Sequence, residues 1–351
     1  MPLLAFEGLP IWLNLALFAV AGAGVWLAGT RLCNYADAIA DRKRIGKALM
    51  GFVFLAAATE LPEMVTTVVG SIAGEARLVL NNMFGGITMQ TAILAVADAT
   101  VPMVALTSYP RNPTPALEGV LLILLLALLL AVSALGDAVL FWNVGIGSVI
   151  FAFAYAGTIV LLRNYDQEEP WLPVEVLEEA AAPLAVAPAR NLDVIPLSQL
   201  VWMSLAATLV ILICGVMLVS LAETLAIQTG WGTSFIGVTL LAASTSLPEL
   251  STTIAAVRLG AFTMAISNIF GSNLIMIALL LPADIFYTEG VILDQIDATA
   301  TFALISGLIV TSVYVAGLLL RNRRKALGMG IDSVIVLLIY SASLVVFYFL
   351  A

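Results

Sequence analysis

Two short segments place glutamates beside a proline inside long apolar stretches. They read T-E-L-P-E at residues 59–63 and T-S-L-P-E at residues 245–249, and together they supply Glu60, Glu63 and Glu249. A carboxylate at the centre of a membrane helix costs about 2.5–3.5 kcal/mol, so three would cost roughly 8–10 kcal/mol without compensation. No Lys or Arg lies near them in either stretch. Protons, bound cations or water must therefore compensate, and the pattern predicts a cation site.

The prolines add neutral oxygens to these carboxylates. Pro62 and Pro248 have no N–H to donate and crowd the carbonyl four residues earlier, which frees the carbonyls of Ala58 and Ser244. Irregular backbone at this depth is tolerated only where it is buried in protein or lines a water-filled cavity. Freed carbonyls, carboxylates and threonine hydroxyls form an all-oxygen site of the kind that Ca²⁺ prefers. One such proline would indicate only a kink, but two at matched positions favour a site.

A second pair of motifs predicts the wall opposite the glutamates. Asn82 and Asn268 each begin the pattern N-x-F-G. Their side chains are interpreted as neutral ligands, with hydrogen bonding between helices as the alternative. Gly85 and Gly271 are interpreted as positions of close helix packing.

These motifs belong to an internal repeat. Residues 51–67 and 237–253 are identical at ten of 17 positions at an offset of 186 residues. The same offset pairs Asp98 with Asp284 and Asp37 with Glu223. Asp98 and Asp284 end apolar stretches, where a solvated acid is expected. Matched Thr, Pro, Glu and Asn at one offset indicate duplication of a whole unit.

The elements that carry the repeat are membrane spans. Of 351 residues, 62% are apolar and 11% charged, against roughly 25% charged in soluble domains. With a mean hydropathy of +1.09 and a net charge of −9, composition excludes a soluble enzyme, a disordered protein and a nucleic-acid binder. The absence of His excludes His-ligated metal sites. Ten spans are predicted at residues 10–31, 46–74, 78–98, 115–135, 138–162, 198–226, 232–258, 262–283, 299–320 and 331–350.

The positive charges predict an orientation for these spans. Of the 14 Lys and Arg residues, only Arg77 falls on one side. The side rich in Lys and Arg is expected to be cytoplasmic, which places both termini outside. Five spans in each half make the second half enter from the opposite face, so the predicted fold is all-α, with two inverted repeats and broken helices 2 and 7. The predicted units are 1–162 with its motif at 51–98, an acidic cytoplasmic linker at 163–197, and 198–351 with its motif at 237–284.

At these motifs the chain resembles the calcium/cation antiporter superfamily, especially its sodium/calcium exchanger branch. The resemblance covers both repeats and the ten-span plan. It implies alternating access, no cofactor, a central calcium-coordinating pair formed by Glu63 and Glu249, and threonine and asparagine ligands. The predicted ion ligands are Glu63, Glu249, Thr59, Thr245, Glu60, Ser246, Asn82 and Asn268.

The chain departs from that branch at positions linked to sodium. Members carry a small hydroxyl residue directly after the motif threonine; Ser246 keeps it, whereas Glu60 replaces it in the first repeat. Leu78 and Met264 stand where a hydroxyl one turn before the asparagine is usual. Three carboxylates in one low-dielectric cavity cannot all ionise without a cation, which favours H⁺ as counter-ion. Kinship favours Na⁺, and both remain open.

The sequence thus predicts a secondary antiporter that exchanges Ca²⁺ or a similar divalent cation for Na⁺ or H⁺, and not an enzyme. The alternatives are an intramembrane hydrolase with paired acids and a passive cation channel. The predicted partners are the lipid bilayer and small inorganic cations, with no nucleic acid and no obligate protein partner. The predicted location is a prokaryotic plasma (inner) membrane.

Overall fold

The computed structural model describes residues 4–165, 192–229 and 242–350, which are predominantly helical. The helices of the first half are α1 (Ile11–Lys43), α2 (Lys47–Leu49), the π-helix η1 (Met50–Leu55), α3 (Ala56–Thr59), α4 (Leu61–Ile72), α5 (Ala76–Asp98), η2 (Leu106–Ser108), α6 (Thr114–Leu135) and α7 (Ile146–Tyr165). Those of the second half are η4 (Leu192–Val194), α8 (Leu197–Gln228), α10 (Leu247–Arg258), α11 (Phe262–Ala278), α12 (Leu280–Phe286), η5 (Ile292–Gln295), α13 (Ala298–Leu320) and α14 (Ile331–Leu350).

The long helices are apolar enough to cross a bilayer. Within the described ranges, eight are long and apolar enough, or nine if the bent pair 47–59 and 61–72 counts as one span. The chain is therefore a multi-pass membrane protein. Part of the predicted span 232–258 and most of the predicted linker 163–197 lie outside the described residues.

Two predicted boundaries are wrong. The span expected at 138–162 begins only at Ile146, because a short hairpin of β1 (Val139–Phe141) and β2 (Val144–Gly145) precedes it. A similar hairpin of β3 (Lys325–Ala326) and β4 (Met329–Gly330) precedes α14. The first span was expected to end at Arg31, but α1 continues to Lys43 and places Arg31 inside the helix.

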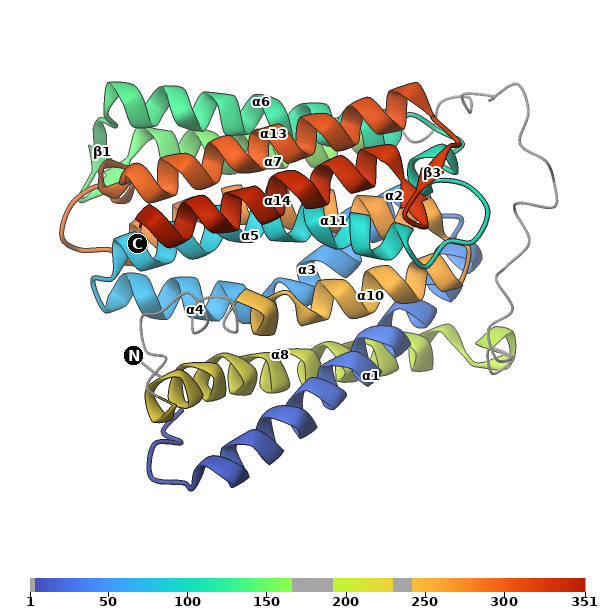
Figure 1. Cartoon of the computed structure of the whole chain (residues 1–351), viewed down its shortest axis with the longest axis horizontal. Helices are drawn as coiled ribbons and strands as arrows, with labels where there is room; N and C mark the ends of the chain where they lie inside the picture. The colour runs from blue at the N-terminus through green and yellow to red at the C-terminus, as the bar shows by residue number, and fades with distance from the viewer. Residues whose placement is uncertain (1–3, 166–191, 230–241, 351) are drawn as a thin grey trace.

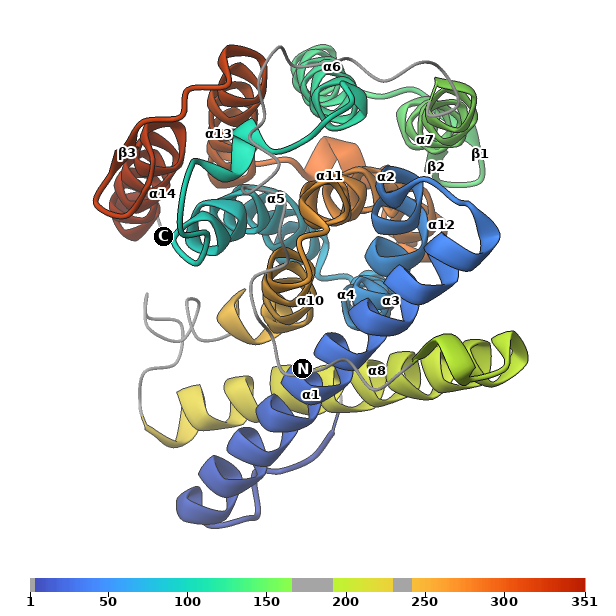
Figure 2. The ribbon, with the colours of Figure 1, turned by 90° about the vertical axis from the view of Figure 1, so that its right-hand side faces the viewer.

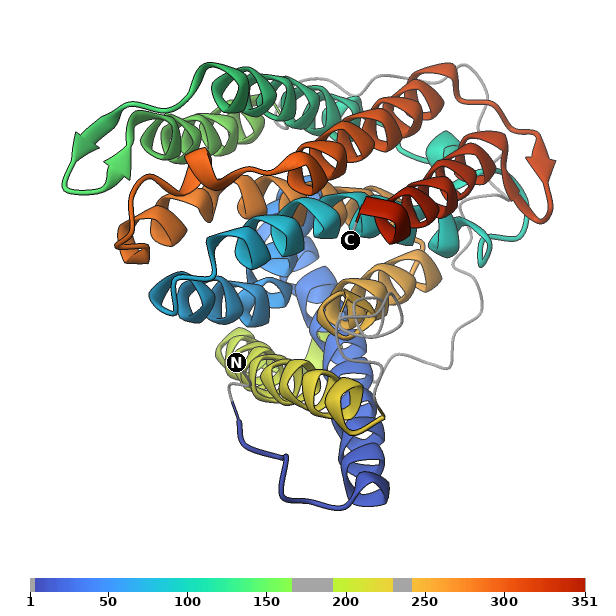
Figure 3. The ribbon, with the colours of Figure 1, turned by 60° about the vertical axis from the view of Figure 1, so that its left-hand side comes forward.

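The helices form a core, an outer arc and a crossing pair (Figures 1 and 2). Seen end on in Figure 2, α5 and α11 lie in the middle, while α14, α13, α6 and α7 curve around one side. On the other side lie α3, α4 and α10, and beyond them the long helices α1 and α8 cross each other, as Figure 3 also shows. Among the long spans, α5 and the α11–α12 segment are the most deeply buried, which explains how their sequences tolerate buried polar residues.

Two buried aspartates fasten loops to the ends of core helices. Asp98 accepts hydrogen bonds from the backbone N–H groups of Leu106 (2.7 Å) and Gly330 (2.6 Å). Asp284 accepts equivalent bonds from Ile292 (2.7 Å) and Gly145 (2.7 Å). Both side chains are fully buried, so the expectation of solvated acids at span ends is wrong. Their charge is instead stabilised by backbone donors.

Both ends of the described chain lie at the same end of the bundle (Figure 1). The loops that follow α5 and α13 lie at the opposite end. There the Arg321 side chain donates to the Ser108 carbonyl oxygen at 2.8 Å, and Lys325 donates to the carbonyl oxygen of Val101. The end that bears the chain termini is called the termini end below, and the other the basic end.

Candidate cation site

The first motif interrupts a membrane helix in the core. Glu60 separates α3 from α4, and the two helical segments on either side of it meet at an angle of 49°. Pro62 is the second residue of α4, where the absence of its N–H leaves no helical hydrogen bond unmade. The second motif has the same form, because Ser246 precedes α10 and Pro248 is its second residue. The interruption is thus a single residue rather than a long unwound segment.

Each new helix begins with a motif glutamate in its first turn. Glu63 lies in the first turn of α4 and Glu249 in that of α10, and their exposed fractions are 2% and 0%. A carboxylate is stabilised at a helix N-terminus by the partial positive charge of the free N–H groups. None of the four carboxylate oxygens has a hydrogen-bond partner among the described residues. Buried acceptors without donors are the groups that a cation would satisfy.

The two halves of the chain meet at these carboxylates. Glu63 lies close enough to Glu249 and Glu60 for their charges to act on it. The Thr59 hydroxyl, which donates to the Ala56 carbonyl oxygen at 3.2 Å, also lies beside the Glu249 carboxylate. Among the described residues, no three acidic or thiol side chains converge as a ready-made metal site. Neutral oxygens must therefore complete any ligand shell around the pair.

The Glu60 carboxylate is contacted by uncharged polar side chains. The Gln90 amide on α5 donates to one Glu60 carboxylate oxygen at 2.7 Å, and Ser272 on α11 lies beside the same group. The second carboxylate oxygen of Glu60 and the amide oxygen of Gln90 have no hydrogen-bond partner in the described part of the chain. The third acid thus lies between the two core helices, fully buried, with an amide and a hydroxyl beside it.

The two motif asparagines have different surroundings. The Asn268 amide nitrogen donates to Thr252 at 3.0 Å and Thr253 at 3.3 Å, which joins α11 to α10. Its carbonyl oxygen is buried and has no donor within the described ranges. Asn268 therefore provides the interhelical bond that was the alternative interpretation, and keeps an oxygen for a ligand. Asn82, in contrast, faces a cavity together with Thr245.

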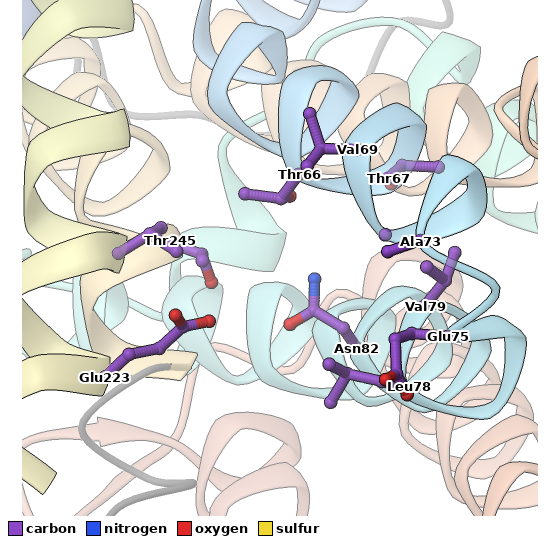
Figure 4. A pocket seen from close by; sticks show the side chains of 12 residues that line it. Thr66, Thr67, Val69, Ala73, Glu75, Leu78, Val79, Asn82, Glu223 and Thr245 are labelled. Atoms are coloured by element: carbon purple, nitrogen blue, oxygen red, sulfur yellow. The ribbon is translucent and has the colours of Figure 1, made fainter. Parts of the chain in front are cut away.

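This cavity lies between α4, α5, α8 and the start of the second motif, and encloses about 70 Å³. In Figure 4 the side chains of Asn82, Thr245 and Glu223 point toward one another across it. Thr66, Thr67 and Val69 line the side formed by α4. The cavity thus collects oxygen atoms from both repeats on one side of the buried carboxylates.

Glycine packing matches the sequence interpretation at one of the two predicted positions. A Cβ on Gly271 would lie 2.4 Å from the Phe52 carbonyl oxygen, and a Cβ on Gly51 would lie 2.4 Å from that of Met264. The π-helix η1 and α11 are therefore in backbone contact next to the site. No described heavy atom lies within 4 Å of the Cβ position of Gly85, and the equivalent contact would fall on residues outside the described ranges.

Sequence reasoning missed Gln90 and did not assign a role to Ser272 or Glu223. Gln90 lies eight residues after Asn82 on α5, two helical turns along the same face, and is a polar residue within an apolar span. This spacing from Asn82 could have identified Gln90 as a candidate site residue. Ser272 stands in the second N-x-F-G motif, and Glu223 was visible only as the repeat partner of Asp37.

Comparisons with known proteins identify the family of this chain. A model of the family described as "Sodium/calcium exchanger protein" matches residues 13–162 and, separately, residues 199–349. The inner membrane protein YrbG of Escherichia coli is 27% identical over 317 residues, which cover 90% of this chain and 91% of YrbG. CaxA of Alkalimonas amylolytica is 25% identical over 272 residues, covering 76% and 78% of the two chains.

Solved structures share the fold. The sodium-calcium exchanger NCX_Mj soaked with 2.5 mM Na⁺ and 0.1 mM Sr²⁺ superposes with a TM-score of 0.72 at 14% identity, covering 96% of this chain and 99% of the other. The same exchanger soaked with 10 mM Na⁺ and zero Ca²⁺ gives a TM-score of 0.69 at 16% identity, with the same coverage. With two matches of one family model over most of its length, the chain belongs to the sodium/calcium exchanger family and is a membrane transporter that exchanges small cations.

Proposed function

We propose that this protein moves Ca²⁺, or a similar hard divalent cation, out of the cell in exchange for Na⁺ or H⁺ by alternating access. The observation that carries the proposal is the pair Glu63 and Glu249: both are buried, both belong to the first turn of an interrupted helix, and neither has a donor among the described residues. Two carboxylates with surrounding neutral oxygens suit a divalent ion better than a monovalent one.

Coupling in this proposal comes from competition for the same carboxylates. The buried pair is stable only when its charge is compensated, either by the divalent ion or by the counter-ions. The hydroxyl oxygens of Thr59 and Thr245, with the amide oxygens of Asn82 and Asn268, complete the shell. Binding of one ion species then displaces the other, and the loaded site opens to the opposite side.

Glu60 carries the counter-ion in this scheme, with Ser246 as its hydroxyl equivalent in the second repeat. Gln90 donates to Glu60 with a neutral amide, so a charged Glu60 still needs a cation or a proton for full compensation. An acid in place of a sodium-binding hydroxyl favours H⁺, whereas membership in the exchanger family favours Na⁺.

The proposal includes ten spans in two inverted repeats of five, 1–162 and 198–351, with the linker 163–197 and the basic end in the cytoplasm. The paired Asp98 and Asp284 anchors, with the two hairpins that they hold, support the duplication. The two separate family matches support it as well. With both termini outside, the cell membrane would be crossed an even number of times.

The deciding experiment measures ⁴⁵Ca²⁺ uptake into vesicles driven separately by a Na⁺ gradient and by a pH gradient. Uptake under one gradient identifies the counter-ion, and Glu63→Gln and Glu249→Gln should each abolish it. Glu289→Gln serves as the control, because Glu289 is exposed in the loop after α12. Folded protein without uptake under either gradient removes the proposal. Flux that needs no counter-ion would indicate a channel instead.

A further inference from the structure

We propose that Glu223, with Asn82 and Thr245, forms an entry site for the divalent cation at the termini end. The site captures the cation from that side when the exchange runs in reverse, and the cation passes it after leaving Glu63 and Glu249 during export. This inference rests on the proposed function and assigns a role to a residue outside both T-x-L-P-E motifs. The ligand class is a hydrated hard divalent cation. The evidence for the site is the cavity of Figure 4, which Glu223 lines together with other oxygen-bearing side chains.

The position of Glu223 suits a site of entry. It lies five residues before α8 ends at Gln228, on the part of α8 that approaches the termini end in Figure 1. Its side chain is half-buried and points into the cavity toward Asn82 and Thr245. Thr245 stands four residues before Glu249, one helical turn in sequence. A cation held at Glu223 would therefore be next to the motif that carries one of the two central ligands.

The chemistry of the cavity suits a cation that keeps part of its water. Glu223 supplies a carboxylate, Asn82 an amide oxygen and Thr245 a hydroxyl, all oxygen ligands. Among the described residues, Glu223 takes part in no ion pair or hydrogen bond, and no Lys or Arg lines the cavity. A volume of about 70 Å³ has room for an ion with one or two waters. A carboxylate in a low-dielectric cleft raises the local concentration of cations.

The repeat partner of Glu223 provides an internal comparison. Asp37 lies six residues before the end of α1, at the basic end, and forms a 2.6 Å ion pair with Lys47. Lys47 also forms a 2.6 Å ion pair with Asp41. The same position thus carries, within the described ranges, an acid without an ion pair to a Lys or Arg side chain at one end of the bundle and an acid paired with Lys47 at the other. Repeat symmetry alone would not produce this difference, so the lack of a Lys or Arg partner in the described part of the chain distinguishes Glu223 from Asp37.

The experiment measures the KM for Ca²⁺ from each side of the membrane. Protease removal of a C-terminal tag identifies the vesicles whose termini end faces the medium. Glu223→Gln should raise the KM from that side about tenfold while the rate at saturating Ca²⁺ stays within about twofold. The KM from the basic end should not change. Glu289→Gln, which removes a charge near the same end but outside the cavity, should leave both KM values unchanged.

Two further measurements keep the test decisive if Glu223→Gln folds poorly. Glu223→Asp keeps the charge and should give a KM between those of the wild type and Glu223→Gln. Choline chloride added to wild-type vesicles should raise the KM from the termini end only, because salt screens a charge at an open entrance. An unchanged KM, or an equal change from both sides, overturns the entry site and leaves the proposed exchange standing. Absence of Ca²⁺ flux in the wild type instead overturns the proposed function.

Discussion

The backbone contact between η1 and α11 makes a quantitative prediction at Gly271. An added Cβ would lie 2.4 Å from the Phe52 carbonyl oxygen and 2.9 Å from the Ala56 Cβ, whereas ordinary contact begins at 3.4 Å. The two segments would have to separate by about 1 Å, and a backbone carbonyl cannot rotate away as a side chain can. Overpacking of this kind costs about 1–3 kcal/mol, and we expect Gly271→Ala at the upper end of that range.

The separation should impair transport as well as stability. Asn268 and Ser272 are on α11, and η1 leads through α3 to Glu60, so a 1 Å shift changes the distances within the site. Sites displaced by about this amount lose function even when all residues are present. Gly271→Ala should therefore transport Ca²⁺ at least about tenfold more slowly at a temperature where the protein remains folded.

The assay pairs thermal melting in detergent with vesicle flux. Gly157→Ala is the matched control, since Gly157 is exposed on α7 and no described heavy atom lies within 4 Å of its Cβ position. The control should not lower the free energy of unfolding and should raise it by at most about 1 kcal/mol, because Ala favours a helix over Gly. Gly51→Ala, whose Cβ would meet the Met264 carbonyl oxygen, should reproduce the loss from the other side of the contact. If Gly271→Ala melts and transports like Gly157→Ala, the tight contact does not exist.

Three further outcomes are expected. Asp98→Ala and Asp284→Ala should each lower the melting temperature by several degrees, because each leaves two buried backbone N–H groups without an acceptor at about 1–3 kcal/mol apiece; unchanged melting would contradict the anchoring role. Gln90→Met should slow ⁴⁵Ca²⁺ flux about tenfold or more, since hydrogen bonds to charged groups contribute about 1.5–3 kcal/mol. Equal rates would show that the Gln90–Glu60 hydrogen bond has no part in transport. In the loop before β1, burial raises the pKa of the Asp137 carboxyl above its ordinary value of 3.8. The contribution of Asp137 to stability should therefore be full below pH 3.8, where its carboxyl is protonated, and should fall as the pH rises through the pKa of Asp137 in the folded state. Melting temperatures over this pH range should decline less in Asp137→Asn.

The sequence predicts where the two motif glutamates lie because their placement depends on local pattern. A proline followed directly by glutamate places the acid in the first turn of the helix that the proline begins, and both Glu63 and Glu249 lie there. The repeat offset also pairs Asp98 with Asp284, but these acids are buried and bind loops, whereas solvated acids were expected. Their burial depends on loops eight residues away and on hairpins from distant parts of the chain, which helical periodicity does not reveal.

Other features could not be read from one sequence because they depend on contacts between distant segments. Gln90 reaches Glu60 only because α5 packs against the interrupted helix, 30 residues away in sequence. Apart from Asn143, the hairpin at 139–145 consists of apolar residues and glycine, so hydropathy extends the neighbouring span through it. Likewise, the residue type alone does not distinguish Glu223 or Asp37 from a surface acid. Only the fold shows that Asp37 forms an ion pair with Lys47 and that Glu223 lines a cavity.

The Asp37–Lys47 ion pair has a consequence for the direction in which the protein works best. Fixed charges at an entrance leave the overall driving force of an exchange unchanged, because the ion gradients and the membrane potential determine it. They do alter how quickly each half of the cycle begins. With the proposed entry site at one end only, the divalent cation would load at a lower concentration from the termini end, during reverse exchange, than it would without the Glu223 charge, whereas the Asp37–Lys47 pair gives no such advantage at the basic end.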